Sequence, residues 1–379
     1  MWKGLKVVWL VAVLSFLAGI SQQTKSEGHG ITDPDQTEQP MELTVCPEGP
    51  PECPFSRIQD AINALPDGAT ILVGPGTYTE NLFILHSVKL LGSGADKTII
   101  RSFSTIEGRP VIFACGEPCT SNPIELTIEG FTIAGAPKKG GAIYVIGGQV
   151  SLRKNVIRDS LGTAIALDKT LFTCIEDNLL LGTGEWFGED VIRITHSMGV
   201  MILGNKIQDY FDGMTIDDSR EVFLEGNTLQ NISFISMSIS GSEEVSVINN
   251  GIIGSGWTAI SLTDSKVIVR GNTIEGGKED GISVSRSEVD ILANVIQGNK
   301  KTGIMVYDEG QMSLSKVSLE ANLIKENHWY GVWINPVEVI VVCRLNKAQG
   351  NKKGDYAIGP LYPLPEPSEE LRRRCEGAG

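Results

Sequence analysis

The sequence predicts an all-β solenoid in which each repeat forms one coil of a parallel β-helix. From about residue 150 onward, an Asn followed two positions later by an aliphatic residue recurs at steps of 22 to 28 residues. The copies are Asn155/Ile157, Asn178/Leu180, Asn205/Ile207, Asn227/Leu229, Asn250/Ile252, Asn272/Ile274, Asn294/Ile296 and Asn322/Ile324. Self-similarity at such a period is typical of a solenoid.

A second phrase, a small residue followed by alternating apolar residues, lies between the Asn phrases, as in residues 281–284 and 303–306. A leucine-rich repeat has a similar period, but the rest of its unit would be helical. Here the remainder is rich in Gly and β-branched residues and alternates, as in residues 281–289 (GISVSRSEV). These features favour two or three short strands per coil.

The first 20 residues indicate an export signal. Lys3 and Lys6 precede an apolar run over residues 7–20, which is too short to span a bilayer comfortably. A retained N-terminal anchor is the alternative, because the end of the run matches a cleavage site poorly. Residues 21–45 are polar and contain Pro, and we expect a flexible leader. The predicted protein is secreted or periplasmic, with no transmembrane anchor in its mature chain.

A short helix is predicted over residues 56–64 (SRIQDAINA), because its apolar residues fall on one side. It precedes residues 76–80 (GTYTE) and 90–94 (LLGSG). This order resembles the N-terminal part of right-handed parallel β-helix proteins of the pectin-lyase-like group. That group includes pectin methylesterases and periplasmic copper-site maturation proteins of the NosD type. The resemblance implies a right-handed β-helix over residues 46–360, capped by the helix and followed by a C-terminal tail at 361–379.

Charge restricts the partners of this chain. It has 32 basic and 46 acidic residues and a net charge of −14. Such a surface would repel nucleic acid and anionic lipid, so no nucleic-acid partner is expected. It suits neutral glycans, divalent cations, or anionic glycans bridged by calcium, the one cofactor considered. No Cys-x-x-Cys occurs and the four His are scattered, so no metal site is predicted.

Seven cysteines in an exported chain predict disulfides. The likeliest pairs lie at the two chain ends, where a crosslink would limit fraying of a solenoid. They are Cys46–Cys53 and Cys343–Cys375. Cys115 and Cys119 bracket a third short stretch, and Cys174 is expected to be free and buried.

Stacking the coils in register places two apolar files inside the solenoid, because alternate residues of a strand face the same side. The first file contains Ile165, Ile192, Met214, Met237, Ile260, Ile282, Ile304 and Val332. The second contains Leu167, Ile194, Ile216, Ile239, Leu262, Val284, Val306 and Ile334. The recurrent Asn residues are predicted to be structural, since Asn tolerates a left-handed turn and its amide can bond to adjacent coils.

Function is expected at outward positions that depart from the repeat. Between the two inner files most residues are small, and Arg193 and Trp333 are the exceptions. Asp190 shares the coil of Arg193, and Asp212 and Asp217 lie on the next coil. Carboxylates one strand apart tend to share a proton or bind a cation. Asp190, Arg193, Asp212 and Asp217 are therefore candidate catalytic residues, for glycosidase chemistry or for removal of a uronate C5 proton. Turns and surface ion pairs would produce the same pattern.

Aromatic residues recur in the turn before the same strand. Exposed Trp and Tyr rings suit pyranose faces, and packing inside the turn is the alternative. The candidate substrate-binding residues are Trp186, Tyr210, Trp257 and Trp333.

The catalytic signatures of pectin methylesterases, polygalacturonases and alginate epimerases are missing, apart from an Asp217-Asp218 pair that resembles one piece of the polygalacturonase pattern. We therefore predict an exported β-helix protein that binds or modifies an extended polysaccharide. A lyase, epimerase or glycoside hydrolase activity stays open. The alternatives are a non-catalytic surface or structural solenoid, such as an adhesin or envelope component, and a NosD-like periplasmic accessory protein. The last lacks the Met or His clusters that copper would favour.

Overall fold

The computed structural model describes residues 41–103, 108–184, 190–308, 315–335, 340–360 and 365–376. They belong to the compact unit Pro40–Gly379. The predicted signal peptide and most of the predicted leader lie outside the described residues.

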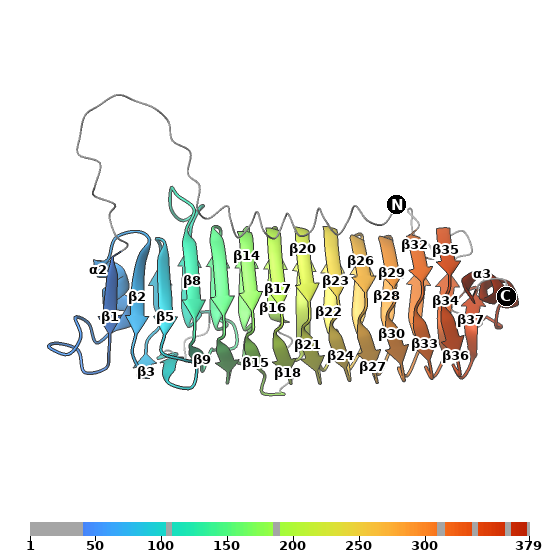
Figure 1. Ribbon diagram of the computed structural model, residues 1–379, viewed down its shortest axis with the longest axis horizontal. Coiled ribbons are helices and arrows are strands. Elements are labelled where there is room, and N and C mark those ends of the chain that lie inside the picture. The colour runs from blue at the N-terminus through green and yellow to red at the C-terminus, as the bar shows by residue number, and fades with distance from the viewer. Residues whose placement is uncertain are drawn as a thin grey trace, which may run out of the picture. The chain divides into compact units, whose positions relative to one another are not determined.

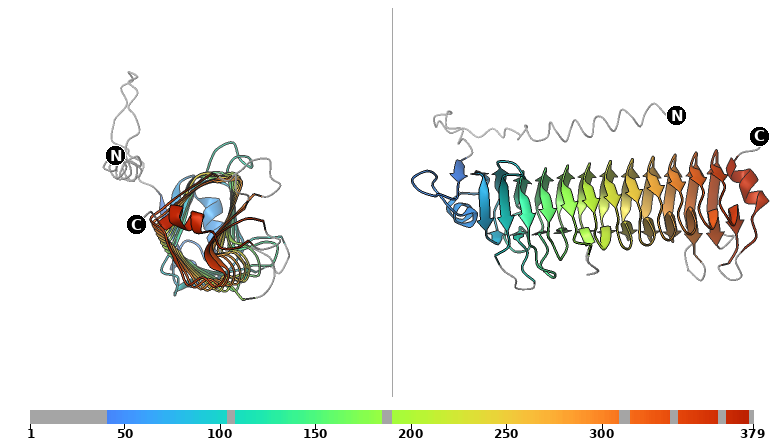
Figure 2. Two further views of the ribbon diagram at one scale, coloured as in Figure 1. Left: turned by 90° about the vertical axis from the view of Figure 1, so that its right-hand side faces the viewer. Right: turned by 90° about the horizontal axis from the view of Figure 1, so that it is seen from below.

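Each coil contributes one strand to each of three parallel sheets, and the coils superimpose when viewed along the stack (Figures 1 and 2). Sheet A contains β1 (Glu42–Val45), β2 (Ala69–Val73), β5 (Val88–Gly92), β8 (Glu125–Glu129), β11 (Gln149–Arg153), β14 (Leu171–Glu176), β17 (Met198–Leu203), β20 (Arg220–Glu225), β23 (Glu243–Ile248), β26 (Lys266–Arg270), β29 (Glu288–Leu292), β32 (Lys316–Glu320) and β35 (Ile340–Arg344). Sheet B contains β3 (Gly76–Thr79), β6 (Thr98–Arg101), β9 (Thr132–Ala134), β12 (Val156–Arg158), β15 (Leu179–Leu181), β18 (Lys206–Gln208), β21 (Thr228–Gln230), β24 (Gly251–Ile253), β27 (Thr273–Glu275), β30 (Val295–Gln297), β33 (Leu323–Lys325) and β36 (Lys347–Gln349).

Sheet C contains β4 (Leu82–Ile84), β7 (Ile112–Cys115), β10 (Ile143–Ile146), β13 (Ile165–Asp168), β16 (Asp190–Thr195), β19 (Asp212–Asp217), β22 (Met237–Ser240), β25 (Ile260–Thr263), β28 (Ile282–Ser285), β31 (Ile304–Tyr307), β34 (Tyr330–Asn335) and β37 (Gly354–Ile358). The prediction of a right-handed parallel β-helix is confirmed. Between residues 150 and 340, the described segments that join the strands contain no helix, so the leucine-rich-repeat alternative is wrong.

Both predicted inner files occur in sheet C with the predicted register. Ile192, for example, pairs with Ile165 on one side and with Met214 on the other. All members of the two files are buried. Each apolar side chain therefore stacks on its counterpart one coil away, at the strand spacing of about 4.8 Å.

The predicted structural role of the recurrent Asn residues is confirmed by a buried ladder from Asn155 to Asn346. Each side-chain amide donates to the Oδ1 atom of the next Asn at 2.8–3.2 Å. The backbone N–H of each Asn donates to the same oxygen. The left-handed position is the residue before the ladder Asn, as at Asp177 (φ 53°) and Asn249 (φ 54°), and not the ladder Asn itself.

The N-terminal end is capped by α2 (Ile58–Ala64), which starts two residues later than predicted and buries Ile58, Ala61 and Ile62. The buried carboxylate of Glu80 accepts the backbone N–H groups of Ile58 (2.9 Å) and Gln59 (3.1 Å). These donors have no partner within the helix, and a carboxylate is favoured there. Glu80, the last residue of the GTYTE segment, thus holds the capping helix in place.

The N-terminal end of the β-helix extends beyond the predicted limit, and the predicted C-terminal tail packs on the last coils. β1 lies inside the predicted leader 21–45, because Leu43 and Val45 pair residue for residue with β2 and Val45 is fully buried. In the predicted C-terminal tail, α3 (Glu369–Glu376) packs against β35 and β37 through buried Leu371 and Cys375. The predicted disulfides Cys46–Cys53 and Cys343–Cys375 are confirmed, Cys115–Cys119 is a third, and Cys174 is free and buried.

Replacing one ladder residue by Ala should show how much the ladder stabilises the fold. Asn250 donates to the carbonyl of Leu224 (2.8 Å), and its Oδ1 accepts the backbone N–H of Asn227 (2.9 Å). Asn250→Ala leaves these buried groups without partners, so we expect a loss of about 3–5 kcal/mol in the free energy of unfolding, measured by chemical denaturation. Asn122→Ala, at an exposed position, should change it by less than about 0.5 kcal/mol. A loss below about 1 kcal/mol at Asn250 would contradict this account of the ladder.

Candidate functional site

Three of the four predicted catalytic residues lie together at the start of neighbouring strands of sheet C. Asp190 pairs with Asp212 across β16 and β19, and Arg193 pairs with Thr215. The fourth, Asp217, lies at the other end of β19, next to Thr195. The predicted set therefore divides between the two ends of the strand.

Asp190 orients Arg193. Its side chain is only 7% exposed. The Oδ2 atom accepts the Nε–H of Arg193 at 2.6 Å and also contacts Nη2, while Oδ1 accepts the hydroxyl of Thr215. A buried carboxylate needs such partners. Both oxygens of Asp190 are therefore hydrogen-bonded, and the carboxylate orients the Arg193 side chain, which is 48% exposed.

Asp212 is the member of the carboxylate pair that takes up a proton near neutral pH. Burial, reinforced by the charge of Asp190, raises the pKa of Asp212 to about 6. A backbone N–H donated by Ile235 (3.3 Å) and the charge of Arg193 act in the opposite direction. Burial also raises the pKa of Asp217, with smaller contributions from Asp190 and Asp218.

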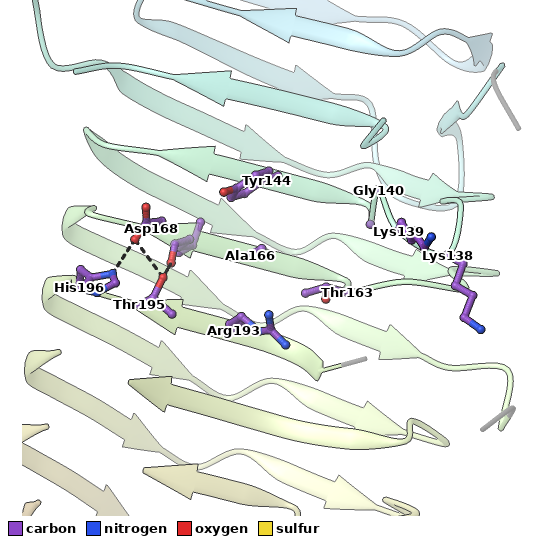
Figure 3. Close-up of a pocket in the computed structure, with 12 residues that line it drawn as sticks. Lys138, Lys139, Gly140, Tyr144, Thr163, Ala166, Asp168, Arg193, Thr195 and His196 are labelled. Carbon is purple, nitrogen blue, oxygen red and sulfur yellow. Dashed lines mark hydrogen bonds and ion pairs between the residues drawn. The ribbon is translucent and has the colours of Figure 1, made fainter. Parts of the chain in front are cut away.

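A pocket of about 410 Å³ lies on the outer face of sheet C beside Arg193 (Figure 3). Tyr144, Ala166 and Arg193 follow one another in a single outward file across β10, β13 and β16. The small side chain of Ala166 leaves the hollow between Tyr144 and Arg193. The loop with Lys138 and Lys139 lines one side of the pocket.

The opposite side of the pocket carries a histidine held by a carboxylate. The Nδ1 atom of His196 lies 2.9 Å from Oδ1 of Asp168, and the hydroxyl of Thr195 donates to the same oxygen at 3.0 Å. With Nδ1 protonated toward Asp168, the lone pair of His196 is on Nε2. Tyr144 lines the same pocket, and burial, together with the charge of Asp168, raises its pKa. The pocket thus combines a cation, an imidazole and a protonated phenol.

The predicted substrate-binding aromatics do not form one surface. Trp333 is 1% exposed and donates its Nε1–H to the carbonyl of Gly359 at 2.9 Å, and Tyr210 is 6% exposed. The chain after β37 folds back here, where Tyr330 donates to the carbonyl of Pro365 (2.5 Å). The expectation that Trp333 and Tyr210 face a sugar is therefore corrected. Trp186 lies outside the described residues.

Trp257 is 45% exposed, but its neighbours cover one face of the ring. Phe211 stacks on Phe234 with centroids 5.7 Å apart, and Phe234 lies 5.5 Å from Trp257. The three residues occupy equivalent positions on successive coils, since the N–H of Phe234 donates to Phe211 and that of Trp257 donates to Phe234. They form a stack along the turns before sheet C, and each ring packs on the next.

Tyr144, Asp168 and the Lys138–Lys139 pair were missed as site residues from the sequence. A signal for Tyr144 exists, because residues 140–146 (GGAIYVI) continue the second repeated phrase one coil earlier. Extending the files by this coil places Tyr144 in register with Arg193. The lysines lie in a turn outside the repeat and have no such signal.

No three His, Cys, Asp or Glu side chains in the described segments come together as a metal site. The described helices include none with the length and apolar character needed to cross a membrane.

Comparison with known proteins supports the fold. Residues 190–337 match the family model described as a right handed beta helix region. A mutant of the periplasmic alginate epimerase AlgG superimposes with a TM-score of 0.50 at 14% identity, covering 75% of this chain and 82% of that one. The catalytic unit of an α-1,3-glucanase from Streptomyces thermodiastaticus gives a TM-score of 0.45 at 15% identity, covering 70% and 64%. At these identities the likeness shows the fold alone. No curated protein matches the chain.

The raised pKa of Asp212 makes stability depend on pH. In the unfolded chain the pKa is about 3.9, so the folded protein binds more protons between about pH 4 and 6, and stability falls as the pH rises through this window. Asp212→Asn removes the buried charge and should raise the free energy of unfolding by about 1 kcal/mol at pH 7.5, after allowance for solvent screening. The gain should vanish below about pH 4. Thermal melts across this range test it, with exposed Asp218→Asn as control. An equal gain at every pH would contradict it.

Proposed function

We propose that this right-handed parallel β-helix protein binds an extended polysaccharide containing uronate residues along the outer face of sheet C. The observation that carries the proposal is the pocket at Arg193, which places a fixed guanidinium beside Lys138 and Lys139 in a chain of net charge −14. An arginine held at two of its nitrogens is preorganised for a carboxylate. The fold shared with an alginate epimerase is compatible with such a ligand.

The surface next to the pocket suits a polymer. From Arg193 the outward file continues through Thr215, Ser238, Ser261 and Ser283, one hydroxyl per coil. These side chains are partly exposed and can exchange hydrogen bonds with sugar hydroxyls. A row of this kind offers the same contact to successive saccharides, which fits an extended chain better than a small metabolite.

Proton transfer at C5 of a bound uronate is a second candidate function. The Asp168–His196 pair and the raised pKa of Tyr144 support it. Nε2 of neutral His196 takes the C5 proton, and Arg193 stabilises the negative charge that develops on the sugar carboxylate. The Tyr144 hydroxyl then gives its proton either to C5 on the opposite ring face, which inverts that centre, or to the leaving oxygen as the C4–O bond breaks and a C4=C5 double bond forms.

Binding is tested with a variant that keeps the buried site neutral. Arg193→Ala alone would leave Asp190 buried and unpaired and should lower the free energy of unfolding by about 3 kcal/mol. The double variant Asp190→Asn/Arg193→Gln leaves no unpaired buried carboxylate. A loss of binding in this variant can therefore be assigned to the pocket and not to unfolding. We expect its affinity for polygalacturonate and alginate to fall about tenfold or more by calorimetry, with Arg270→Gln on exposed sheet A as control. Unchanged affinity in the double variant would leave the structural-solenoid alternative.

Catalysis is tested separately from binding. In D₂O, turnover should introduce deuterium at C5 or produce an unsaturated uronate, followed by NMR and ultraviolet absorbance. His196→Gln and Tyr144→Phe should each lower the rate by about 10² or more and keep polymer affinity within about threefold, because neither change removes a positive charge of Arg193. A protein that binds polyuronate but gives neither product is a binding protein only.

A further inference from the structure

Basic residues occupy the turns between sheets B and C on four successive coils toward the C-terminal end. This basic ladder consists of Lys278, Lys300, Lys301, His328, Lys352 and Lys353. The N–H of Lys300 donates to the carbonyl of Gly277, that of His328 to Asn299 and that of Lys352 to Asn327, each at 2.9 Å. Each of these residues thus lies beside the corresponding turn of the preceding coil. Such a concentration of positive charge contrasts with the net charge of −14.

Two tryptophans contact the ammonium groups of Lys301 and Lys353. Lys301 Nζ lies 5.8 Å from the ring centroid of Trp257 and 5.4 Å from that of Trp329, and Lys353 Nζ lies 4.3 Å from Trp329. Glu279 also pairs with Lys301. Cation–π contacts of this kind restrict long, mobile side chains, which lowers the entropy lost when an anion binds. The indoles of Trp257 and Trp329 therefore position cations.

The ladder and the Arg193 pocket lie along the same side of the coils. The N–H of Trp329 donates to the carbonyl of Lys301, and the N–H of Trp257 to that of Phe234, each at 3.0 Å, so both belong to the turns that precede sheet C. From β16, which carries Arg193, to β34, which follows Trp329, there are six strand steps in sheet C. At about 4.8 Å each, they amount to about 29 Å.

We infer that the basic ladder is a second anion-binding site, which takes the distal part of the same acidic polysaccharide whose uronate occupies the Arg193 pocket. This inference rests on the proposed function. Lysines on three of four successive coils suit a polymer with repeated carboxylates. A chain long enough to reach both sites binds the second one as an intramolecular event and gains affinity without any new contact. Oligomers too short to span the distance occupy one site at a time.

The experiment compares oligogalacturonides of increasing length with a ladder variant. In the unaltered protein, affinity measured by calorimetry at low salt should rise steeply once the oligomer spans both sites. In Lys300→Gln/Lys352→Gln/Lys353→Gln, this rise should disappear, so that the affinity for long polymer falls about tenfold or more while that for short oligomers stays within about twofold. The matched control Lys89→Gln/Lys206→Gln/Lys347→Gln changes net charge equally at exposed lysines outside the ladder and should keep the length dependence.

The outcomes separate the two proposals. If short oligomers bind and the ladder variant keeps the full length dependence, the ladder inference is wrong and the pocket proposal survives. If short oligomers bind no better to the unaltered protein than to Asp190→Asn/Arg193→Gln, while the ladder variant still weakens long polymer, the pocket proposal fails. A single-stranded oligonucleotide of equal charge that binds as tightly as polyuronate, and loses as much in the ladder variant, would overturn the assignment to a glycan.

Discussion

The buried amide ladder is the constraint on which the rest of this structure depends. Each Asn satisfies backbone groups in its own coil and in its neighbours, and none of these groups has access to water. A coil that slipped by one residue would lose these bonds and turn its apolar files outward. Register is therefore fixed at every step, and every outward position acquires a defined neighbour one strand away. The pocket follows from this, since Tyr144, Ala166 and Arg193 meet only because their coils are in register.

The buried carboxylate of Asp190 determines the orientation of Arg193 and contributes to the raised pKa of Asp212. Asp190 is a nearly buried carboxylate beside the outward file of sheet C. It binds Arg193, and its charge adds to the effect of burial in raising the pKa of Asp212. The same charge thus prepares a cation for an anionic ligand and keeps a neighbouring carboxyl protonated over a wider pH range. A surface ion pair would do neither to the same extent, because water screens it.

Periodicity was enough to predict the inner files, the Asn ladder and the pairing of Asp190 with Asp212, because each is set by contacts between adjacent coils. The disulfides at the ends were predicted from the positions of the cysteines along the chain. Features that depend on other contacts were missed. The pocket exists because Ala166 is small and a loop stands beside it, and neither fact is part of the repeat. Trp333 is buried because the chain folds back after β37. The sequence around Trp333 contains no signal of this reversal. The capping of α2 by Glu80, in the GTYTE segment, was likewise not predicted, because it depends on a contact between a helix and a turn outside the repeat.

Because the coils are stacked, the length of the β-helix can change by one repeat at a time. Between β16 and β34 the coils are nearly interchangeable in their inner files and ladders, so a whole repeat can be gained or lost there without disturbing the chemistry at either end. Each such event would move the two ends apart or together by one strand spacing and leave them in the same angular position around the core. A duplication of some 22 residues would thus change the distance between the two ends by one fixed step. In a globular protein, a comparable change in the length of a binding cleft would require new packing of the residues that line it.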